Sequence, residues 1–143
     1  MSAAKLFQIL LTEMNEIFQS DRYFILHDVV ASHGQLLLRS QKNMEYPFNI
    51  DVIFYGTTFV QLFSRLYSLR LSKVDKAVKD SNYETVKKYL EYDNSHLFQI
   101  ESNNEMYYIA ASFVVIYENQ MTFSESSLNA DDKGTLLAAS FNE

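Results

Sequence analysis

Hydrophobic and polar residues at the start of the chain follow the period of a helix. Apolar residues recur at three- and four-residue spacing: Leu6, Leu10, Met14 and Ile17, with Phe7, Leu11 and Phe18 beside them. This spacing gathers apolar side chains on one face of an α-helix, and Ser2 stands where a helix N-cap belongs. We therefore expect an amphipathic helix over about residues 3 to 18.

From Arg22 the pattern becomes typical of β-strands. Residues 22–31 (RYFILHDVVA) are rich in β-branched and aromatic side chains, Ser-His-Gly interrupts them, and residues 35–40 (QLLLRS) resume the apolar run. This pattern predicts a strand, a turn and a second strand. Residues 48–55 alternate between apolar and mostly polar positions, which predicts a third strand with one buried face.

The next segments are shorter. Gly56-Thr57 precedes TFVQLF, and glycine supplies the positive φ that a two-residue hairpin turn needs, so we expect a hairpin here, with a β-bulge at Gly56 as the alternative. LYSLRL (66–71) predicts a short further strand. Residues 72–94 contain helix formers and two Ser-x-x-acid capping signatures, which predict two short helices or one broken helix.

The last part of the chain predicts another antiparallel pair. HLFQIES (96–102) and the apolar run 105–123 flank Asn103-Asn104, a pair that tolerates the left-handed backbone of a hairpin turn. Periodicity then disappears. We expect residues 125–143 to form a loosely ordered tail, or TLLAASF (135–141) to dock as a last strand or helical turn.

These elements predict an α+β fold in a single globular domain spanning residues 1–143. The expected architecture is a mainly antiparallel sheet of five to seven strands, with an N-terminal helix and a central helical region packed on it. The chain has no cysteine, and no run reaches the ~20 apolar residues that span a bilayer. Glu13 and Glu16 interrupt the first apolar stretch, so we expect no signal peptide, no membrane partner and a cytoplasmic location.

The net charge of −6 is unevenly distributed. Residues 65–88 carry seven basic and three acidic groups, whereas residues 89–143 carry one lysine and nine acidic groups. The lysines of the basic stretch alternate with Asp75, Asp80 and Glu84, which favours a solvated helix face over a nucleic-acid site. The acidic C-terminal third repels phosphates and attracts basic partners, or serves only solubility.

The histidines offer the first candidate for chemistry. Along an extended strand, His27 and His33 are up to ~20 Å apart, which is too far to share a metal with bonds of about 2 Å. Ser32, His33 and Asp28 lack the glycine-flanked elbow that presents a nucleophilic serine. With only three glycines, the chain also has no phosphate-binding loop. We expect a hairpin with a solvent-facing histidine, and neither a metal, a cofactor nor an enzymatic activity.

Ten tyrosines, several among carboxylates, offer a second candidate. Tyrosine suits a half-buried strand, and it is also a frequent anchor of protein interfaces. Carboxylates around exposed rings would steer a basic protein toward them. The residues predicted to bind a partner are Tyr89, Glu91, Tyr92, Asp93, Glu101, Glu105, Tyr107 and Tyr108.

Three segments carry a resemblance to a known class of proteins. SHGQLLLRS, NIDVIFYGTTFVQL and LYSLRL resemble the strand region of small bacterial immunity proteins encoded beside polymorphic toxins, over residues 24–71. The resemblance implies a non-enzymatic cytoplasmic inhibitor that occludes the active site, or a neighbouring surface, of a basic toxin domain. The alternatives are a structural or regulatory interaction domain with another partner and a hydrolase with an unrecognised site. The oligomeric state stays open.

Overall fold

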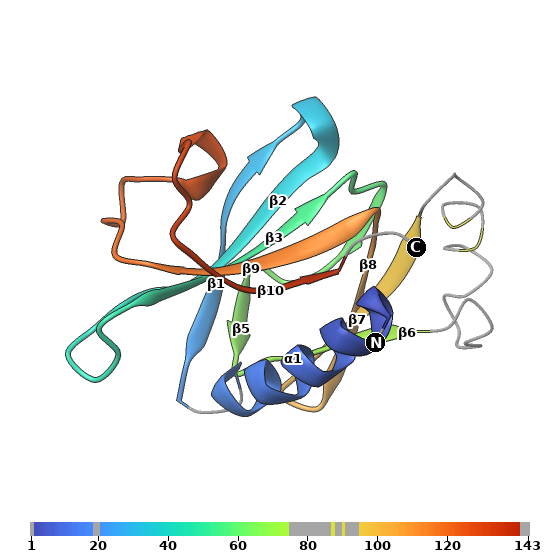
Figure 1. Ribbon diagram of the computed structural model, residues 1–143, viewed down its shortest axis with the longest axis horizontal. Helices are drawn as coiled ribbons and strands as arrows, with labels where there is room; N and C mark the ends of the chain where they lie inside the picture. Colours follow the sequence, from blue (N-terminus) through green and yellow to red (C-terminus); the bar gives the residue numbers. More distant parts are fainter. Residues whose placement is uncertain (1, 19–20, 75–86, 88–89, 91–94, 141–143) are drawn as a thin grey trace.

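In the computed structural model (Figure 1), the residues described are 2–18, 21–74, 87, 90 and 95–140. They form an α-helix, two 3₁₀ turns and ten strands. In chain order the elements are α1 (Ala3–Phe18), β1 (Tyr23–Val30), η1 (Ser32–Gly34), β2 (Gln35–Ser40), β3 (Asn49–Tyr55), β4 (Phe59–Gln61), β5 (Arg65–Tyr67), β6 (Arg70–Val74), β7 (His96–Ser102), β8 (Glu105–Ala111), β9 (Phe113–Asn119), η2 (Ser127–Asn129) and β10 (Thr135–Ser140).

The described strands form two antiparallel sheets. The six-stranded sheet has the order β10-β9-β3-β2-β1-β5, and the four-stranded sheet has the order β4-β8-β7-β6. The prediction of an α+β fold with mainly antiparallel pairing is confirmed. The prediction of a single sheet with five to seven strands gives too few strands, since the described residues form ten strands in two sheets. Three segments that we expected to be continuous strands or hairpins are each divided between the two sheets.

The division occurs at three small residues. Gly56 separates β3 from β4, Ser68 separates β5 from β6, and Ser112 separates β8 from β9. Gly56 and Ser68 have positive φ, 64° and 51°. A Cβ at Gly56 would overlap the Oγ of Ser112. The β3–β4 and β8–β9 connections, where the chain crosses from one sheet to the other, are therefore in contact. The hairpin expected at Gly56-Thr57 is therefore wrong, since β3 and β4 lie in different sheets.

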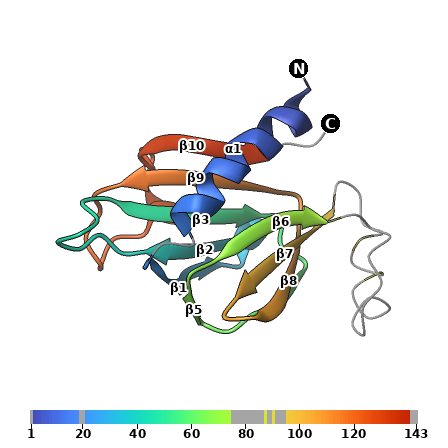
Figure 2. The ribbon, with the colours of Figure 1, turned by 90° about the horizontal axis from the view of Figure 1, so that it is seen from below.

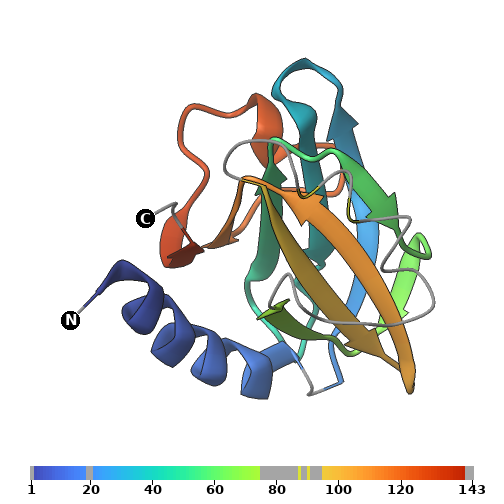
Figure 3. The ribbon, with the colours of Figure 1, turned by 90° about the vertical axis from the view of Figure 1, so that its right-hand side faces the viewer.

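The hydrophobic core lies between the sheets. Figure 3 shows β7 and β8 crossing in front of the strands of the six-stranded sheet. Core side chains come from both sheets, and the rings of Phe54 and Phe98 meet at 5.6 Å between centroids. Because both inner faces are apolar, the two sheets bury each other's surface, which is the main stabilising contribution expected in such a fold.

Helix α1 packs beside β10 and β6, as Figure 2 shows. Its predicted range and its cap are confirmed, since Ser2 Oγ accepts a hydrogen bond from the Lys5 N–H. The buried face is formed by Phe7, Leu11, Met14 and Phe18. Leu6 and Ile17, expected on that face, are 49% and 38% exposed. The stripe with two phenylalanines fills the core, because it buries the larger apolar area.

A polar contact fixes the helix against the edge of the four-stranded sheet. The Asn15 amide donates to the Leu71 carbonyl and accepts from the Leu71 N–H, each at 2.9 Å. In this way the side chain pairs with the β6 backbone as a neighbouring strand would.

The other predicted elements have mixed outcomes. The hairpins β1–β2 and β7–β8 are confirmed, and the alternative of a last strand at TLLAASF is confirmed as β10. The central helical region lies outside the described residues for most of its length. Its first residues, Ser72 to Val74, belong to strand β6, so the helix does not begin there. Within the described residues, no helix has the length and apolar character required to cross a membrane.

Candidate functional site

The structure describes half of the residues predicted to bind a partner. Tyr89, Glu91, Tyr92 and Asp93 lie outside the described residues. The β7–β8 hairpin brings the other four together: Glu101 on β7, and Glu105, Tyr107 and Tyr108 on β8. The hairpin turns at Asn103 and Asn104, whose φ values of 53° and 64° are those of a left-handed two-residue turn.

The two tyrosines of this hairpin differ in burial. Tyr108 is 7% exposed and packs with Leu97 and Ala110 on the face of the sheet that points away from the main core. Tyr107 is half-buried, and its ring lies 5.4 Å from that of Phe63. Because adjacent strand residues point to opposite faces, only Tyr107 joins the rim where β4 and β5 are connected.

Exposed apolar side chains gather around this hairpin. Phe63 and Tyr67 are 68% and 67% exposed, and Met106 is 46% exposed. Ser102 Oγ donates to the Tyr67 carbonyl at 2.9 Å, which holds β5 beside the hairpin end. We define the hairpin surface as Phe63, Tyr67, Glu105 and Tyr107, together with Glu101 and Met106, which form a cross-strand pair on the opposite face of the hairpin end. Sequence reasoning missed Phe63 and Tyr67, since the strand pattern alone does not show which apolar side chains stay outside the core.

A second cluster of polar side chains is buried on the outer face of the six-stranded sheet. Arg39 on β2 and Asp51 on β3 are cross-strand partners, and both are fully buried. The guanidinium binds the carboxylate with two bonds, Nε to Oδ1 at 2.6 Å and Nη2 to Oδ2 at 2.9 Å. Asn119 Nδ2 donates to Asp51 Oδ2 at 2.8 Å, and Asn49 Nδ2 donates to Asn119 Oδ1 at 2.8 Å.

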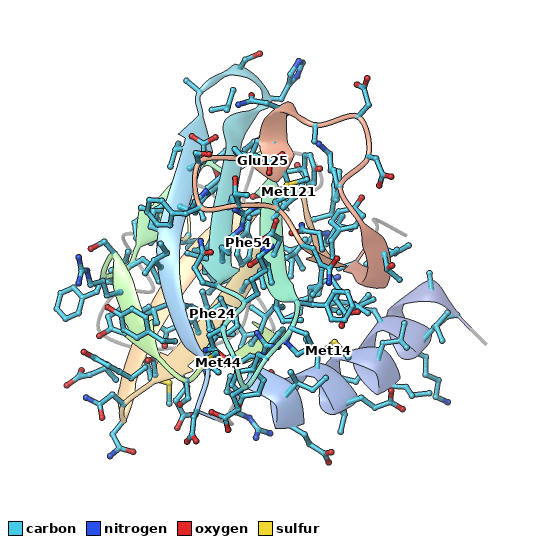
Figure 4. The ribbon with its side chains drawn as sticks, turned by 90° about the vertical axis from the view of Figure 1, so that its left-hand side faces the viewer. Met14, Phe24, Met44, Phe54, Met121 and Glu125 are labelled. Carbon is cyan, nitrogen blue, oxygen red and sulfur yellow. The ribbon has the colours of Figure 1, made fainter. Side chains whose placement is uncertain are left out.

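The segment 120–134 covers this cluster, and Figure 4 shows it, with Met121 and Glu125 labelled, crossing the sheet. Arg39 Nη1 donates to the Glu125 carbonyl at 2.8 Å, and Nη2 contacts Met121 Sδ at 3.5 Å. His27 Nε2 lies 3.1 Å from the Glu125 carbonyl and 3.2 Å from Arg39 Nη1. These contacts fasten the segment to β1 and β2.

The turn of the covering segment is closed by a carboxylate. Glu125 Oε1 accepts from the Thr122 N–H at 2.9 Å and from the Thr122 hydroxyl at 3.0 Å. These two bonds hold the pKa of Glu125 below its usual range, with a smaller contribution from the nearby charges of Lys42 and Arg39.

We call this buried cluster of Arg39, Asp51, Asn49 and Asn119 the polar clamp. Each nitrogen of the Arg39 guanidinium already has at least one partner in the protein, and the Asp51 carboxylate is held by Arg39 and Asn119. A bidentate pair with this much hydrogen bonding offsets much of the cost of its own burial but leaves no donor for a substrate. A signal for the pair was present in the sequence, since Arg39 and Asp51 are charges inside strongly apolar strands.

The predicted histidine hairpin is observed. His33 is exposed in η1 with a φ of 64°, while His27 contacts the covering segment and the edge of the Phe123 ring. The part of the chain that the structure describes has no group of three or more His, Asp or Glu side chains able to hold a metal ion. Comparison of the chain with protein-family models, curated proteins and solved structures gives no match.

Proposed function

We propose that this chain is a cytoplasmic, non-enzymatic protein-binding inhibitor of the toxin-immunity type, and that it docks a basic toxin domain through the hairpin surface. The observation that carries the proposal is that the end of the β7–β8 hairpin, together with Phe63 and Tyr67 near it, exposes both apolar side chains and carboxylates. Phe63 and Tyr67 expose much of their area on the side of Glu105 and Tyr107, and Met106 is exposed beside its cross-strand partner Glu101.

The composition of this surface resembles the centre of a protein interface. Aromatic residues and methionine are enriched at interface cores, and large rings dominate the binding energy when they become fully buried. Phe63 rests on Tyr107 and Tyr67 rests on Tyr23, with centroids 5.4 Å and 4.8 Å apart. The exposed rings are therefore already positioned by neighbours, which lowers the entropy lost on binding.

The charge of the chain favours a basic partner. The net charge is −6, and nine acidic groups against one lysine lie in residues 89–143, which include the hairpin. Carboxylates around an apolar centre accelerate association with a positively charged protein and discriminate against acidic ones. Glu101 and Glu105 stand at the end of the hairpin, where they would act in this way.

The polar clamp on the other sheet is not a candidate catalytic site for the hydrolase alternative. Its arginine and aspartate are committed to each other and to the covering segment, so they are unsuited to acid–base chemistry on a substrate. A structural or regulatory interaction domain would use the same hairpin surface, and the identity of the partner separates this alternative from an immunity protein.

Co-expression with a neighbouring toxin tests the proposal. The first step is to identify the gene immediately upstream; if it encodes a toxin, its C-terminal domain is the probe, expressed with the wild-type chain or with Phe63→Ala or Tyr67→Ala variants. We expect the wild-type chain to restore growth, and each alanine variant to weaken binding of the purified toxin domain by about 2 kcal/mol, roughly 30-fold.

The matched control is Leu136→Ala, which removes a similarly exposed apolar side chain from β10, at the far edge of the six-stranded sheet from β5. It should leave growth and affinity unchanged. An upstream gene for a metabolic enzyme, or a toxin that kills equally with and without the chain, would show that the proposed function is wrong.

A further inference from the structure

A pocket of about 400 Å³ opens at the β1–β5 edge of the six-stranded sheet. Four segments that are far apart in the sequence line it: residues 21–23 with Ile25, residues 40–43, Arg65 and Phe123. Its volume lies within the range of small-molecule sites. The pocket shares no lining residue with the hairpin surface.

Two side chains in the pocket wall have buried donors without partners. Arg22 is 7% exposed, and its Nε has no hydrogen-bond acceptor among the described residues. The Nε2 of Gln41 is likewise buried and unpaired. Native proteins pair nearly all such groups, because a buried donor without an acceptor is costly. Both side chains line the pocket, and because neither nitrogen is accessible, each would have to turn toward an acceptor bound there to pair with it.

The remaining contacts of Arg22 are to neutral groups. Its Nη1 lies 3.2 Å from Ser40 Oγ and both Nη atoms lie 3.4 Å from the Phe48 carbonyl, while the guanidinium stacks 4.2 Å above the Tyr46 ring. Burial lowers the pKa of Arg22, and the fields of Tyr46 and Glu118 offset this only in part. A buried cation held by neutral partners leaves room for an anion.

The charged side chains that line the pocket also favour the binding of an anion. Arg22, Lys42 and Arg65 give three positive charges, against one negative charge from Asp21. Lys42 Nζ is bound to the Gln120 carbonyl, another neutral group. Within the described residues, neither Arg22 nor Arg65 forms a salt bridge. The pocket is therefore locally cationic in a chain whose net charge is −6.

Apolar side chains complete the wall. Tyr23, Ile25 and Phe123 line the pocket, and the Phe123 ring is 68% exposed. A bare inorganic ion would leave these surfaces in water, whereas an apolar or aromatic group attached to the anion would cover them.

From these observations we infer that the pocket binds a small organic anion. The anionic group, a phosphate or a carboxylate, is held by Arg22, Gln41 and Arg65, and the apolar body of the ligand lies against Tyr23 and Phe123. This site adjoins the hairpin surface, because Tyr23 contacts Tyr67, but it shares no lining residue with that surface and does not depend on the function proposed for it.

Titration with simple aromatic anions tests the site. Phenyl phosphate and benzoate are the two probes for the anionic group, and benzyl alcohol is the neutral control, each followed through backbone amide shifts in NMR spectra. We expect saturable shifts at Arg22, Gln41 and Arg65 with an affinity of about 1 mM or tighter for at least one anion, and none with benzyl alcohol. The stronger anion identifies the group that the pocket prefers.

Two variants separate the roles of charge and wall. Arg65→Gln should weaken the bound anion about tenfold, whereas Arg70→Gln, an exposed arginine on β6, should leave it unchanged. Phe123→Ala should weaken phenyl phosphate and leave any weak binding of inorganic phosphate unaltered.

Three results would overturn the inference. They are the absence of saturable shifts for both anions in the folded wild-type chain, equal weakening by Arg65→Gln and Arg70→Gln, and equal shifts with benzyl alcohol. None of these results bears on growth rescue by the hairpin surface, so the two proposals fail independently.

Discussion

At the scale of single residues, the buried Arg39–Asp51 pair carries the strongest consequence for stability. Asp51→Asn places an amide nitrogen where the carboxylate accepts from Arg39 and Asn119, so a donor then faces donors. Leaving Arg39 as an uncompensated buried charge should lower the free energy of unfolding by about 3–5 kcal/mol. Urea denaturation measures this change.

Two further variants serve as controls for Asp51→Asn. One replaces both members of the pair, and the other replaces an arginine at the surface. Arg39→Met combined with Asp51→Leu removes both charges and should recover much of the loss, because apolar residues of similar size tolerate such a site. Arg65→Met, at an exposed position, should change the free energy of unfolding by no more than about 0.5 kcal/mol. An Asp51→Asn variant as stable as wild type would contradict the clamp.

Glu125 predicts a pH response of the covering segment. Its hydrogen bonds from Thr122 lower the pKa of the carboxyl in the folded chain, so their stabilisation is complete above the usual glutamate pKa. It is lost as pH falls through the lowered folded value. We expect amide exchange at Thr122, corrected for its intrinsic pH dependence, to accelerate as the carboxyl becomes protonated.

Two glutamate variants are expected to differ in this response to pH. Glu125→Gln should already exchange faster at neutral pH and lose this acid step, whereas Glu105→Gln, at the hairpin turn, should keep it. A Thr122 exchange profile that is the same in wild type and Glu125→Gln would show that the carboxylate does not close the turn.

At the scale of elements, the sequence pattern predicted those features that depend on residues close together in the chain. The β1–β2 and β7–β8 hairpins could be predicted because turn residues and apolar runs are adjacent in sequence. The division into two sheets could not, since Ser68 and Ser112 look like ordinary polar positions within apolar runs. Their role depends on the chain segments that they contact in the fold, which the sequence does not show. The lining of the edge pocket comes from four separate segments, so it could not be predicted either.

The crossing at Gly56 provides a test of this architecture. Gly56→Ala must hold a φ of 64° with a Cβ that overlaps Ser112 Oγ, so it should lower the free energy of unfolding by about 1–3 kcal/mol. Adding Ser112→Gly removes the overlap but not the backbone strain, and should restore part of the loss. Thermal unfolding of the single and double variants measures both effects. No rescue would mean that the two crossings do not touch.

At the scale of the whole molecule, the two proposed surfaces differ in charge. The hairpin surface carries Glu101 and Glu105, whereas the edge pocket is lined by Arg22, Lys42 and Arg65. The net charge of the chain is consistent with the acidic hairpin but conceals the basic pocket lining, because it averages over surfaces of different local charge. Tyrosine and acid content singled out the candidate residues of the hairpin, which stay a prediction, whereas Phe63 and Tyr67 became candidates only with the fold.

The association rate with the neighbouring toxin domain tests the central claim most directly. The double variant Glu101→Lys/Glu105→Lys and the control Glu13→Lys/Glu16→Lys on α1 change the net charge equally, and stopped-flow mixing at low salt compares them with wild type. Local steering predicts about tenfold slower association for the hairpin variant and a much smaller change for the helix variant. Equal slowing of both variants, or an unchanged rate in the hairpin variant, would contradict docking through the hairpin surface.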